Sequence, residues 1–307
     1  MHETASVLSR AAELARTGRA FVLMTVVRAQ GSTPREAGAM MLLAPGDQAG
    51  AAGSPRADGM LADEGGAIMG TIGGGQFEHI AMDDARRSLR ERRSGLERYV
   101  LGAEAEQCCG GVLEVFFQYT APAVNVVIFG AGHVAAHVAP LLVSAPVRTV
   151  IVDDRAEWNS AARFGAAARV LDWSAGVALC RREGARAVAF VMTCSHRTDE
   201  HLVRGLLSDD APGSVPAFVG LIGSRSKRAC LFGRLVAGGI EPERVERVRC
   251  PIGVGDTGKE PAALAISIAA QALIEAKKIR DAEAGSARAV STAKSCALHT
   301  RDADAGA

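Results

Sequence analysis

The stretch between Asn125 and Asp154 constrains the fold more strongly than any other part of this sequence. It starts as an apolar run that ends at residues 130–132 (GAG), continues with helical spacing to about Val143, and finishes as a β-branched run before Asp153. This order predicts a strand, a tight glycine turn, a helix, a second strand and an acid. Such a turn offers unpaired N–H groups and a positive helix end to an anion, and the acid is placed to accept a ribose hydroxyl. We therefore predict a Rossmann-like βαβ unit.

The rest of the sequence predicts two domains. A length of 307 residues suffices for two separate hydrophobic cores. From residue 124 onward strands and helices alternate, which indicates a doubly wound parallel sheet. We expect an α/β protein with an N-terminal mixed α+β domain over residues 1–120, a linker at 120–123, and a Rossmann-like domain over 124–279. Residues 280–307 hold almost no large apolar side chains, so a disordered tail is expected there.

Apolar periodicity and turn residues predict the individual elements. Helices are expected over residues 4–17, 76–93, 133–143, 175–183, 200–207, 226–237 and 261–278. Strands are expected over residues 21–27, 39–43, 98–101, 112–119, 125–129, 147–152, 169–171, 187–193 and 217–222. Residues 44–66 are rich in Gly, Ala, Pro and Asp, which indicates an irregular surface loop with one further strand inside it.

Composition makes several classes of function less favoured, although local basic clusters keep their own significance. The chain carries 35 basic and 34 acidic residues, so its overall charge gives no reason to expect nucleic acid or an anionic membrane as partner. The N-terminal segment is amphipathic with an acid at position 3, unlike an export signal, and no stretch is long enough to span a bilayer. Seven cysteines, an odd number, favour reduced thiols. We expect a cytoplasmic protein.

Three predicted helix N-termini are suited to anions. The first follows the glycine turn at residue 130, the second follows the glycines at residues 73–75, and the third opens with two hydroxyls and three cations at residues 224–228. A capped helix with a solvated face is the alternative at each site, but three such turns favour a phosphorylated or otherwise anionic ligand. The candidate contacts are Gly130, Gly132 and His133, then Gly74 and Glu78, then Ser224 and Arg225.

Two cysteine-containing segments carry further chemistry. Cys108 and Cys109 precede two glycines on a predicted turn, where a thiolate can bind a soft metal or take part in sulfur chemistry. Two small buried side chains are the alternative, and the absence of a CxxC pair argues against structural zinc. Cys194 and His196 follow a predicted strand at the carboxyl edge of the sheet. Ligand contact is favoured there over nucleophilic catalysis, because nothing in the sequence orients the imidazole, but a purely structural role is favoured over both.

The order and spacing of these motifs resemble the xanthine dehydrogenase accessory protein family, XdhC and its CoxI relatives, from about residue 5 to about residue 275. Six short segments carry the likeness: residues 31–35 (GSTPR), 73–78 (GGGQFE), 107–111 (QCCGG), 129–135 (FGAGHVA), 220–228 (GLIGSRSKR) and 251–253 (PIG). The likeness to the xanthine dehydrogenase type is close.

The resemblance implies a function and a set of partners. The family's reported role is to bind molybdenum cofactor, a pterin with a phosphate and a dithiolene-bound molybdenum, and to support its sulfuration by a NifS-like cysteine desulfurase. The family protects the cofactor and delivers it to apo xanthine dehydrogenase, and an upstream molybdenum cofactor biosynthesis protein supplies it. The cofactor-binding residues implied are Cys108, Cys109, Gly130, Gly132, His133, Ser224, Arg225, Gly74 and Glu78, with Cys109 as the contact to molybdenum. Relatives often carry a histidine and an acid where this chain has Cys194 and Ser195, so no metal or base role is carried over to those two positions.

Three functions are compatible with these motifs. We favour a molybdenum cofactor chaperone that is not an enzyme and has no turnover of its own. An NAD(P)-dependent oxidoreductase that uses Asp153 to bind the ribose is one alternative, although the sequence offers no convincing proton-donor set beside a substrate pocket. A scaffold that bridges the desulfurase and xanthine dehydrogenase is the other. Paired domains and apolar content are compatible with a homodimer.

Overall fold

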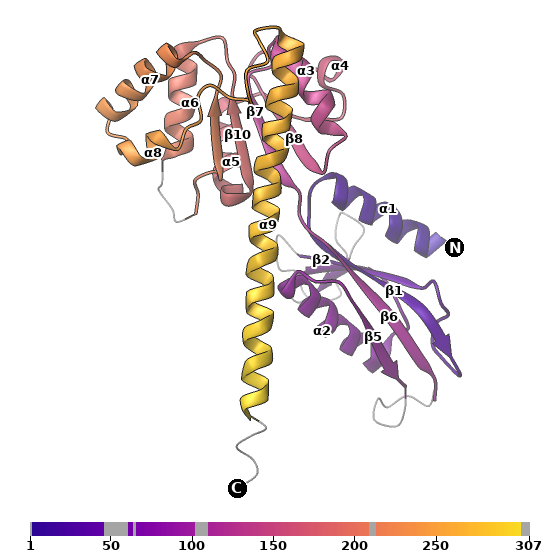
Figure 1. Cartoon of the computed structure of the whole chain (residues 1–307). Coiled ribbons are helices and arrows are strands. Elements are labelled where there is room, and N and C mark those ends of the chain that lie inside the picture. The colour runs from indigo at the N-terminus through magenta and orange to yellow at the C-terminus, as the bar shows by residue number, and fades with distance from the viewer. Residues whose placement is uncertain (1, 46–60, 64–65, 102–109, 209–212, 302–307) are drawn as a thin grey trace. The chain divides into compact units, whose positions relative to one another are not determined.

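The computed structural model describes residues 2–45, 61–63, 66–101, 110–208 and 213–301 (Figure 1). The chain forms two compact units, of which one comprises residues 1–122 and 284–307 and the other residues 123–283. The boundary after Pro122 falls inside the segment that the sequence predicts as a linker. Among the described residues, no helix has the length and apolar character needed to cross a membrane.

The first unit is built on a six-stranded antiparallel sheet of order β3-β4-β2-β1-β6-β5. Its strands are β1 (Phe21–Gln30), β2 (Met40–Pro45), β3 (Leu61–Asp63), β4 (Gly66–Gly70), β5 (Gly95–Val100) and β6 (Val112–Thr120). Its helices before the linker are α1 (His2–Arg16) and α2 (Gly75–Glu91). The central strand β1 pairs with β6 on one side and with β2 on the other.

Alternation along β1 explains why this sheet carries a helix on each face. Val22, Met24 and Val26 project to one face, where they share a hydrophobic cluster with α2. Phe21 and Leu23 project to the opposite face and share a cluster with α1. Because successive side chains of a strand point to opposite faces, a strand that is apolar at nearly every position can be covered on both sides.

The second unit holds a five-stranded parallel sheet of order β11-β10-β7-β8-β9. Its strands are β7 (Val124–Phe129), β8 (Val147–Val152), β9 (Ala168–Val170), β10 (Ala187–Val191) and β11 (Phe218–Leu221). Counted from β7, this is the order 3-2-1-4-5 of a Rossmann sheet, and a parallel bridge between Gly220 and Arg249 extends the β11 edge. The predicted α/β fold with a doubly wound parallel sheet is confirmed.

Helices cover both faces of the parallel sheet (Figure 1). They are α3 (His133–Val143), α4 (Ala161–Phe164), α5 (Trp173–Glu183), α6 (His196–Leu207), α7 (Arg225–Ala237), α8 (Pro242–Glu246) and α9 (Pro261–Arg301). One cluster joins Val127 and Phe129 of β7 to α5, α6, α7 and α8, and the other joins Val126 and Ile128 to α3, α4 and α9. Every residue of β7 is buried, as a strand covered on both faces requires.

Some element boundaries differ from the predicted ones. Helix α9 continues to Arg301, so residues 280–301 are helical where composition predicted a disordered tail. That prediction considered burial alone, whereas alanine, which recurs through this stretch, has the highest helix propensity without being buried. β5 begins at Gly95, earlier than predicted, and β4 (Gly66–Gly70) was not predicted. The one further strand expected within residues 44–66 is present as β3. Helix α6 begins at His196 and not at residue 200, which places this histidine in the first helical turn.

Candidate functional site

Three turns lie at the carboxyl edge of the parallel sheet. They follow β7, β10 and β11 and contain residues 130–132, 192–195 and 222–224. Because parallel strands end at the same edge, the fold brings the first and third predicted anion turns to one edge together with Cys194 and His196. The predicted residues Gly74 and Glu78 lie in the first unit. The predicted Cys108 and Cys109 lie outside the described residues.

The glycine turn after β7 packs directly against the end of β10. Gly130 has a φ of +109°, and a Cβ there would lie 2.5 Å from the carbonyl oxygen of Met192, so a larger residue would clash. Gly132 is the N-cap of α3, and nothing lies within 4 Å of the position its Cβ would occupy. The first glycine therefore fixes the turn, and the second leaves the helix N-terminus accessible to a ligand.

The acid after β8 is turned inward. The Asp153 side chain is fully buried, and its Oδ2 accepts a hydrogen bond from the backbone N–H of Ala131 at 2.7 Å. Arg155 donates from Nε to Oδ1 at 2.8 Å and from Nη2 to Oδ2 at 2.7 Å, a bidentate pair. Burial by itself would raise the pKa of Asp153, but the hydrogen bonds from Arg155 and Ala131 outweigh it and hold the pKa below its usual value. Both carboxylate oxygens are thus engaged inside the protein.

Two arginines lie over the Trp158 ring beside this turn. The guanidinium carbon of Arg155 lies 5.0 Å from the centre of the indole ring, and that of Arg163 lies 4.8 Å from it. Arg163 also donates from Nη1 to the carbonyl oxygen of Ala131 at 2.7 Å. The predicted contact His133 meets the Trp158 ring edge-on, with 5.8 Å between ring centres. The loop after β8 therefore borders the glycine turn with aromatic and cationic groups.

A second buried carboxylate connects the turn after β10 to α7. Asp199 is fully buried, and its Oδ1 accepts a hydrogen bond from the hydroxyl of Thr193 at 2.7 Å. Its Oδ2 accepts from Nζ of Lys227 at 2.5 Å, and the same Nζ donates to the carbonyl oxygen of Ile222 at 2.8 Å. These bonds hold the turns after β10 and β11 in a fixed relation to each other.

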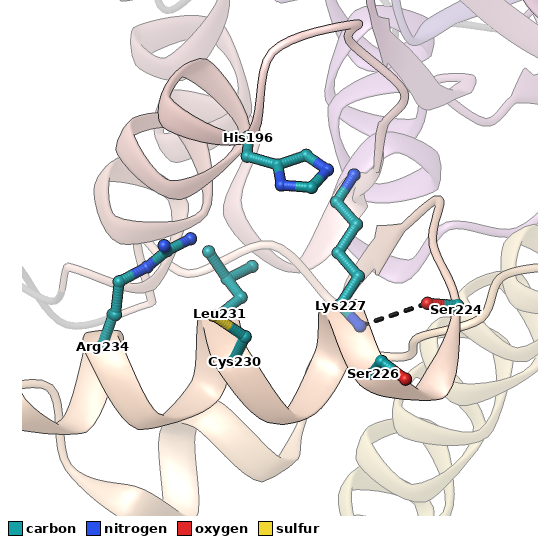
Figure 2. Close-up of a pocket in the computed structure, with 7 residues that line it drawn as sticks. All are labelled: His196, Ser224, Ser226, Lys227, Cys230, Leu231 and Arg234. Atoms are coloured by element: carbon teal, nitrogen blue, oxygen red, sulfur yellow. Dashed lines mark hydrogen bonds between the residues drawn. The ribbon is translucent and has the colours of Figure 1, made fainter.

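The N-terminal turns of α6 and α7 border a pocket of about 490 Å³ (Figure 2). Ser195 caps α6 by accepting a hydrogen bond from the N–H of Thr198, and Ser224 caps α7 by accepting one from the N–H of Lys227, each at 3.2 Å. The pocket is lined by His196, Ser224, Ser226, Lys227, Cys230, Leu231 and Arg234. The predicted Ser224 belongs to this lining, and the predicted Arg225 is exposed beside it.

The thiols of the second unit fall into two classes. Cys180 and Cys250 are buried, and burial raises the pKa of both thiols, so they remain protonated at neutral pH. Cys194 and Cys230 are exposed. Within the part of the chain that the structure describes, no three His, Cys, Asp or Glu side chains are grouped so as to hold a metal ion.

The predicted anion turn before α2 contains its own carboxylate. Glu78 Oε2 accepts hydrogen bonds from the backbone N–H groups of Ile72 at 3.0 Å and Gly74 at 3.1 Å, and from the hydroxyl of Thr71. Glu78 thereby satisfies donors that an external anion would otherwise use. Gly74 has a φ of +74° and no atom within 4 Å of its Cβ position, so its backbone stays accessible. Ligand contact by either residue stays a prediction.

Loops of the first unit come together at Gly111. A Cβ there would lie 2.3 Å from the carbonyl oxygen of Ser32 and 2.7 Å from Cγ2 of Thr33. Gly73 approaches Pro34 in the same loop, where a Cβ would lie 2.6 Å from Cγ of the proline ring. Three of the motif segments, at residues 31–35, 73–78 and 110–111, therefore share one region of this unit.

Four residues that complete these sites were difficult to recognise from the sequence as site residues. Arg155 and Asp199 act through hydrogen bonds to groups that only the fold brings near them. The spacing of Cys230 and Arg234 gave a weak indication, because at i+3 and i+7 from Lys227 they lie on the same face of α7.

The chain matches two family models. The model of the XdhC Rossmann domain matches residues 126–272, and the model of the XdhC and CoxI family matches residues 14–64 and 49–100. The chain belongs to the XdhC family. The two matches fall on the second and the first unit respectively, and the resemblance inferred from the sequence motifs is confirmed.

Two further proteins are similar to this XdhC-family chain. The uncharacterised protein YqeB of Escherichia coli (strain K12) is 26% identical over 272 residues, which make up 87% of this chain and 46% of that protein. The chain therefore spans about half the length of this relative. A crystal structure of a xanthine dehydrogenase from Bacillus halodurans is 18% identical with a TM-score of 0.44, and the match covers 89% of this chain and 96% of that one. A TM-score this low carries no functional information.

Replacing Gly111 by alanine is expected to destabilise the first unit by about 1–3 kcal/mol, because the new methyl group would overlap the carbonyl oxygen of Ser32. Gly110→Ala is the matched control, since nothing lies within 4 Å of its Cβ position. That substitution is expected to be neutral or stabilising by up to about 1 kcal/mol. Differential scanning calorimetry of the two variants measures the contrast, and equal transition temperatures would contradict the packing at Gly111.

Asp153→Asn is expected to destabilise the second unit by about 2–3 kcal/mol. This is less than the cost of breaking a fully buried ion pair, because the Arg155 side chain is 37% exposed. The exposed neighbour Asp154 provides the control, with a change within about 0.5 kcal/mol for Asp154→Asn. Urea denaturation followed by tryptophan fluorescence reports on this unit, because both tryptophans, Trp158 and Trp173, lie in it.

The effect of Asp153→Asn is expected to depend on pH. The pKa of this carboxyl is lowered by folding, so its stabilisation is complete above the unfolded-state pKa of about 3.9 and is lost as the pH falls through the lower folded-state value. The difference in unfolding free energy between wild type and variant should therefore be constant from about pH 8 to about pH 5 and shrink below about pH 4. A difference that grows on acidification would contradict this assignment.

Proposed function

We propose that this protein is a maturation factor for xanthine dehydrogenase that binds molybdenum cofactor as cargo, protects it in sulfurated form and delivers it to the apoenzyme. Membership of the XdhC family supports the maturation role. The buried Asp153 is the geometric observation that carries the choice of ligand. The glycine turn keeps an accessible helix N-terminus at Gly132, yet the acid that a dinucleotide requires is engaged by Arg155. An anionic ligand without a ribose suits such an edge better than NAD(P).

The cargo carries a phosphate at one end and molybdenum at the other, and the chain offers chemistry for each. Glycine backbone, hydroxyl and guanidinium groups at the edge of the parallel sheet suit the phosphate. A soft thiolate, which Cys108 or Cys109 would supply, suits the metal side. The contacts proposed for the phosphate lie on two separate turns of the sheet edge, Gly130, Gly132 and His133 on one and Ser224 and Arg225 on the other. Cys108 and Cys109 are proposed for molybdenum, and Gly74 and Glu78 as further contacts.

The proposal includes three protein partners. Xanthine dehydrogenase receives the cofactor, a NifS-like cysteine desulfurase supplies the sulfur, and an upstream molybdenum cofactor biosynthesis protein hands the cofactor over. On this proposal the protein is a binding and insertion factor in the cytoplasm and not an enzyme, and a homodimer is compatible with its two units. A scaffold that only bridges desulfurase and target enzyme is the competing role. Pull-down of both proteins by a variant that retains no cofactor would favour the scaffold.

Cofactor retention tests the proposal directly. Protein purified from cells that make the cofactor is passed through gel filtration, and the released pterin is quantified by fluorescence. Cys109→Ala is expected to lower retention about tenfold or more, since the loss of about 1.4 kcal/mol of contact already has that effect. Cys194→Ala, which removes an exposed thiol of the second unit, is the control and should retain the cofactor. Wild type that retains no molybdopterin would overturn the proposal, and full retention by Cys109→Ala would overturn the thiol contact.

Titration with nicotinamide nucleotides distinguishes the chaperone from an oxidoreductase. Because Asp153 is unavailable to a ribose, NAD(H) and NADP(H) are expected to bind with dissociation constants above about 1 mM. Quenching of Trp158, which lies beside the glycine turn, provides the signal. Micromolar binding accompanied by turnover would favour the oxidoreductase instead.

A further inference from the structure

The pocket between α6 and α7 has the size and the groups of a ligand site. Its volume of about 490 Å³ lies within the range of roughly 300–1,000 Å³ typical of small-molecule sites. Figure 2 shows His196 projecting from the start of α6 toward the side chains of α7. Lys227, Cys230 and Arg234 line the pocket from one face of α7. The lining thus combines three nitrogen-bearing side chains with hydroxyl and thiol groups.

The charge of this lining favours an anion. Among the described residues no carboxylate lines the pocket, and the partner of Lys227, Asp199, is fully buried. Two of the three N–H donors of the Lys227 ammonium are used, on Asp199 and on the carbonyl oxygen of Ile222. Arg234 pairs with Glu200 through Nε at 2.8 Å, and its guanidinium has four other N–H donors. Each cation therefore keeps donors for a ligand.

Two helix N-termini reinforce that preference. α6 has 12 residues and starts at His196, and α7 has 13 residues and starts at Arg225. Residues of both first turns line the pocket: His196 in α6, and Ser226 and Lys227 in α7. The caps from Ser195 and Ser224 satisfy one N–H in each helix, whereas an α-helix leaves its first four N–H groups without a partner inside the helix. The positive ends of both helix dipoles add to the attraction for an anion.

We propose that this pocket binds a phosphate monoester group and that it is the place where the phosphate end of the cargo is held. Lys227 and Arg234 supply charge and hydrogen bonds, His196 supplies a further hydrogen bond, and Ser226 supplies a hydroxyl. The identity of the cargo rests on the proposed function, whereas the anion chemistry of the pocket does not.

The glycine turn after β7 is less suited to the same group. The N–H of Gly130 donates to the carbonyl oxygen of Val152 at 2.8 Å, and the N–H of Ala131 donates to Asp153 at 2.7 Å. β10 separates β7 from β11, so at a strand spacing of about 4.8 Å the two turns are roughly 10 Å apart. One phosphate group cannot contact both. The phosphate contacts at Ser224 are therefore favoured over those at Gly130.

Cys230 is a native reporter for occupancy of the pocket. Full-length protein is alkylated with iodoacetamide in the presence of inorganic phosphate, and each cysteine is quantified by peptide mass spectrometry. At a phosphate concentration ten times the dissociation constant, alkylation of Cys230 is expected to slow about tenfold, because only about one site in eleven is empty. Cys194 is exposed but does not line the pocket, so its rate should be unchanged.

Arg234→Gln tests the proposed contact. The phosphate concentration for half-protection of Cys230 is expected to rise about tenfold, the effect of losing one hydrogen bond to a charged group. Arg228→Gln is the matched control, because Arg228 lies on the same helix outside the lining. Arg228 pairs with Glu246 at 2.6 Å much as Arg234 pairs with Glu200 at 2.8 Å. The control should stay within about twofold of wild type, and both variants are checked for an unchanged unfolding midpoint.

The outcomes separate this inference from the proposed function. Equal slowing at Cys194 and Cys230, or an Arg234→Gln protein with the half-protection concentration of wild type, would overturn the pocket. Molybdopterin retention by the same two variants tests the link to the cargo, and full retention by Arg234→Gln would overturn that link. If wild type retained no molybdopterin while phosphate still protected Cys230, the proposed function would fail, the link to the cargo would fail with it, and the anion site would stand.

Discussion

The buried Asp153 carboxylate holds the carboxyl edge of the parallel sheet together. It accepts hydrogen bonds from the backbone of Ala131 and from the backbone and guanidinium of Arg155. A carboxylate buried without such donors would be strongly destabilising, so this set of bonds is a requirement of the fold. Gly130 makes the arrangement feasible, because only a residue without a side chain can lie against Met192 while Ala131 reaches the acid. The glycine turn and the loop after β8 both depend on this one group.

Asp199 has the same role at the turn after β10, which lies on the opposite side of β7 from β8. It is fully buried, accepts from Thr193 in the turn after β10, and pairs with Lys227 of α7. Two acids at the sheet edge, Asp153 and Asp199, therefore fasten its turns, while Asp154, His196 and Arg225 stay exposed there. Around the turns after β10 and β11, the polar groups that line the pocket are cations, hydroxyls and helix N-termini. The preference for anions that we propose for this part of the edge would follow from the same bonds that make it rigid.

Local sequence patterns predicted the longer elements but missed the short β4, α4 and α8, and they failed where distant side chains decide the outcome. The glycine turn and Asp153 both follow from an apolar run, two glycines and a β-branched run, all within one segment. The partners of the acids do not, since Lys227 is 28 residues from Asp199 and pairs with it only because β10 and β11 are neighbours. Residues 280–301 were mispredicted for another reason, because a criterion of buried apolar surface does not apply to a helix supported by alanine propensity.

The engagement of Asp153 also decides which ligands the edge can accept without being disrupted. A dinucleotide that recruited this carboxylate for its ribose would first have to break the pair with Arg155, at a cost of about 2–3 kcal/mol or roughly 30- to 150-fold in affinity. A phosphate monoester between α6 and α7 makes no such demand, because Lys227 and Arg234 keep donors beyond their pairs with Asp199 and Glu200. A phosphorylated ligand that lacks a ribose can therefore bind this sheet edge while the interaction on which the edge depends stays intact.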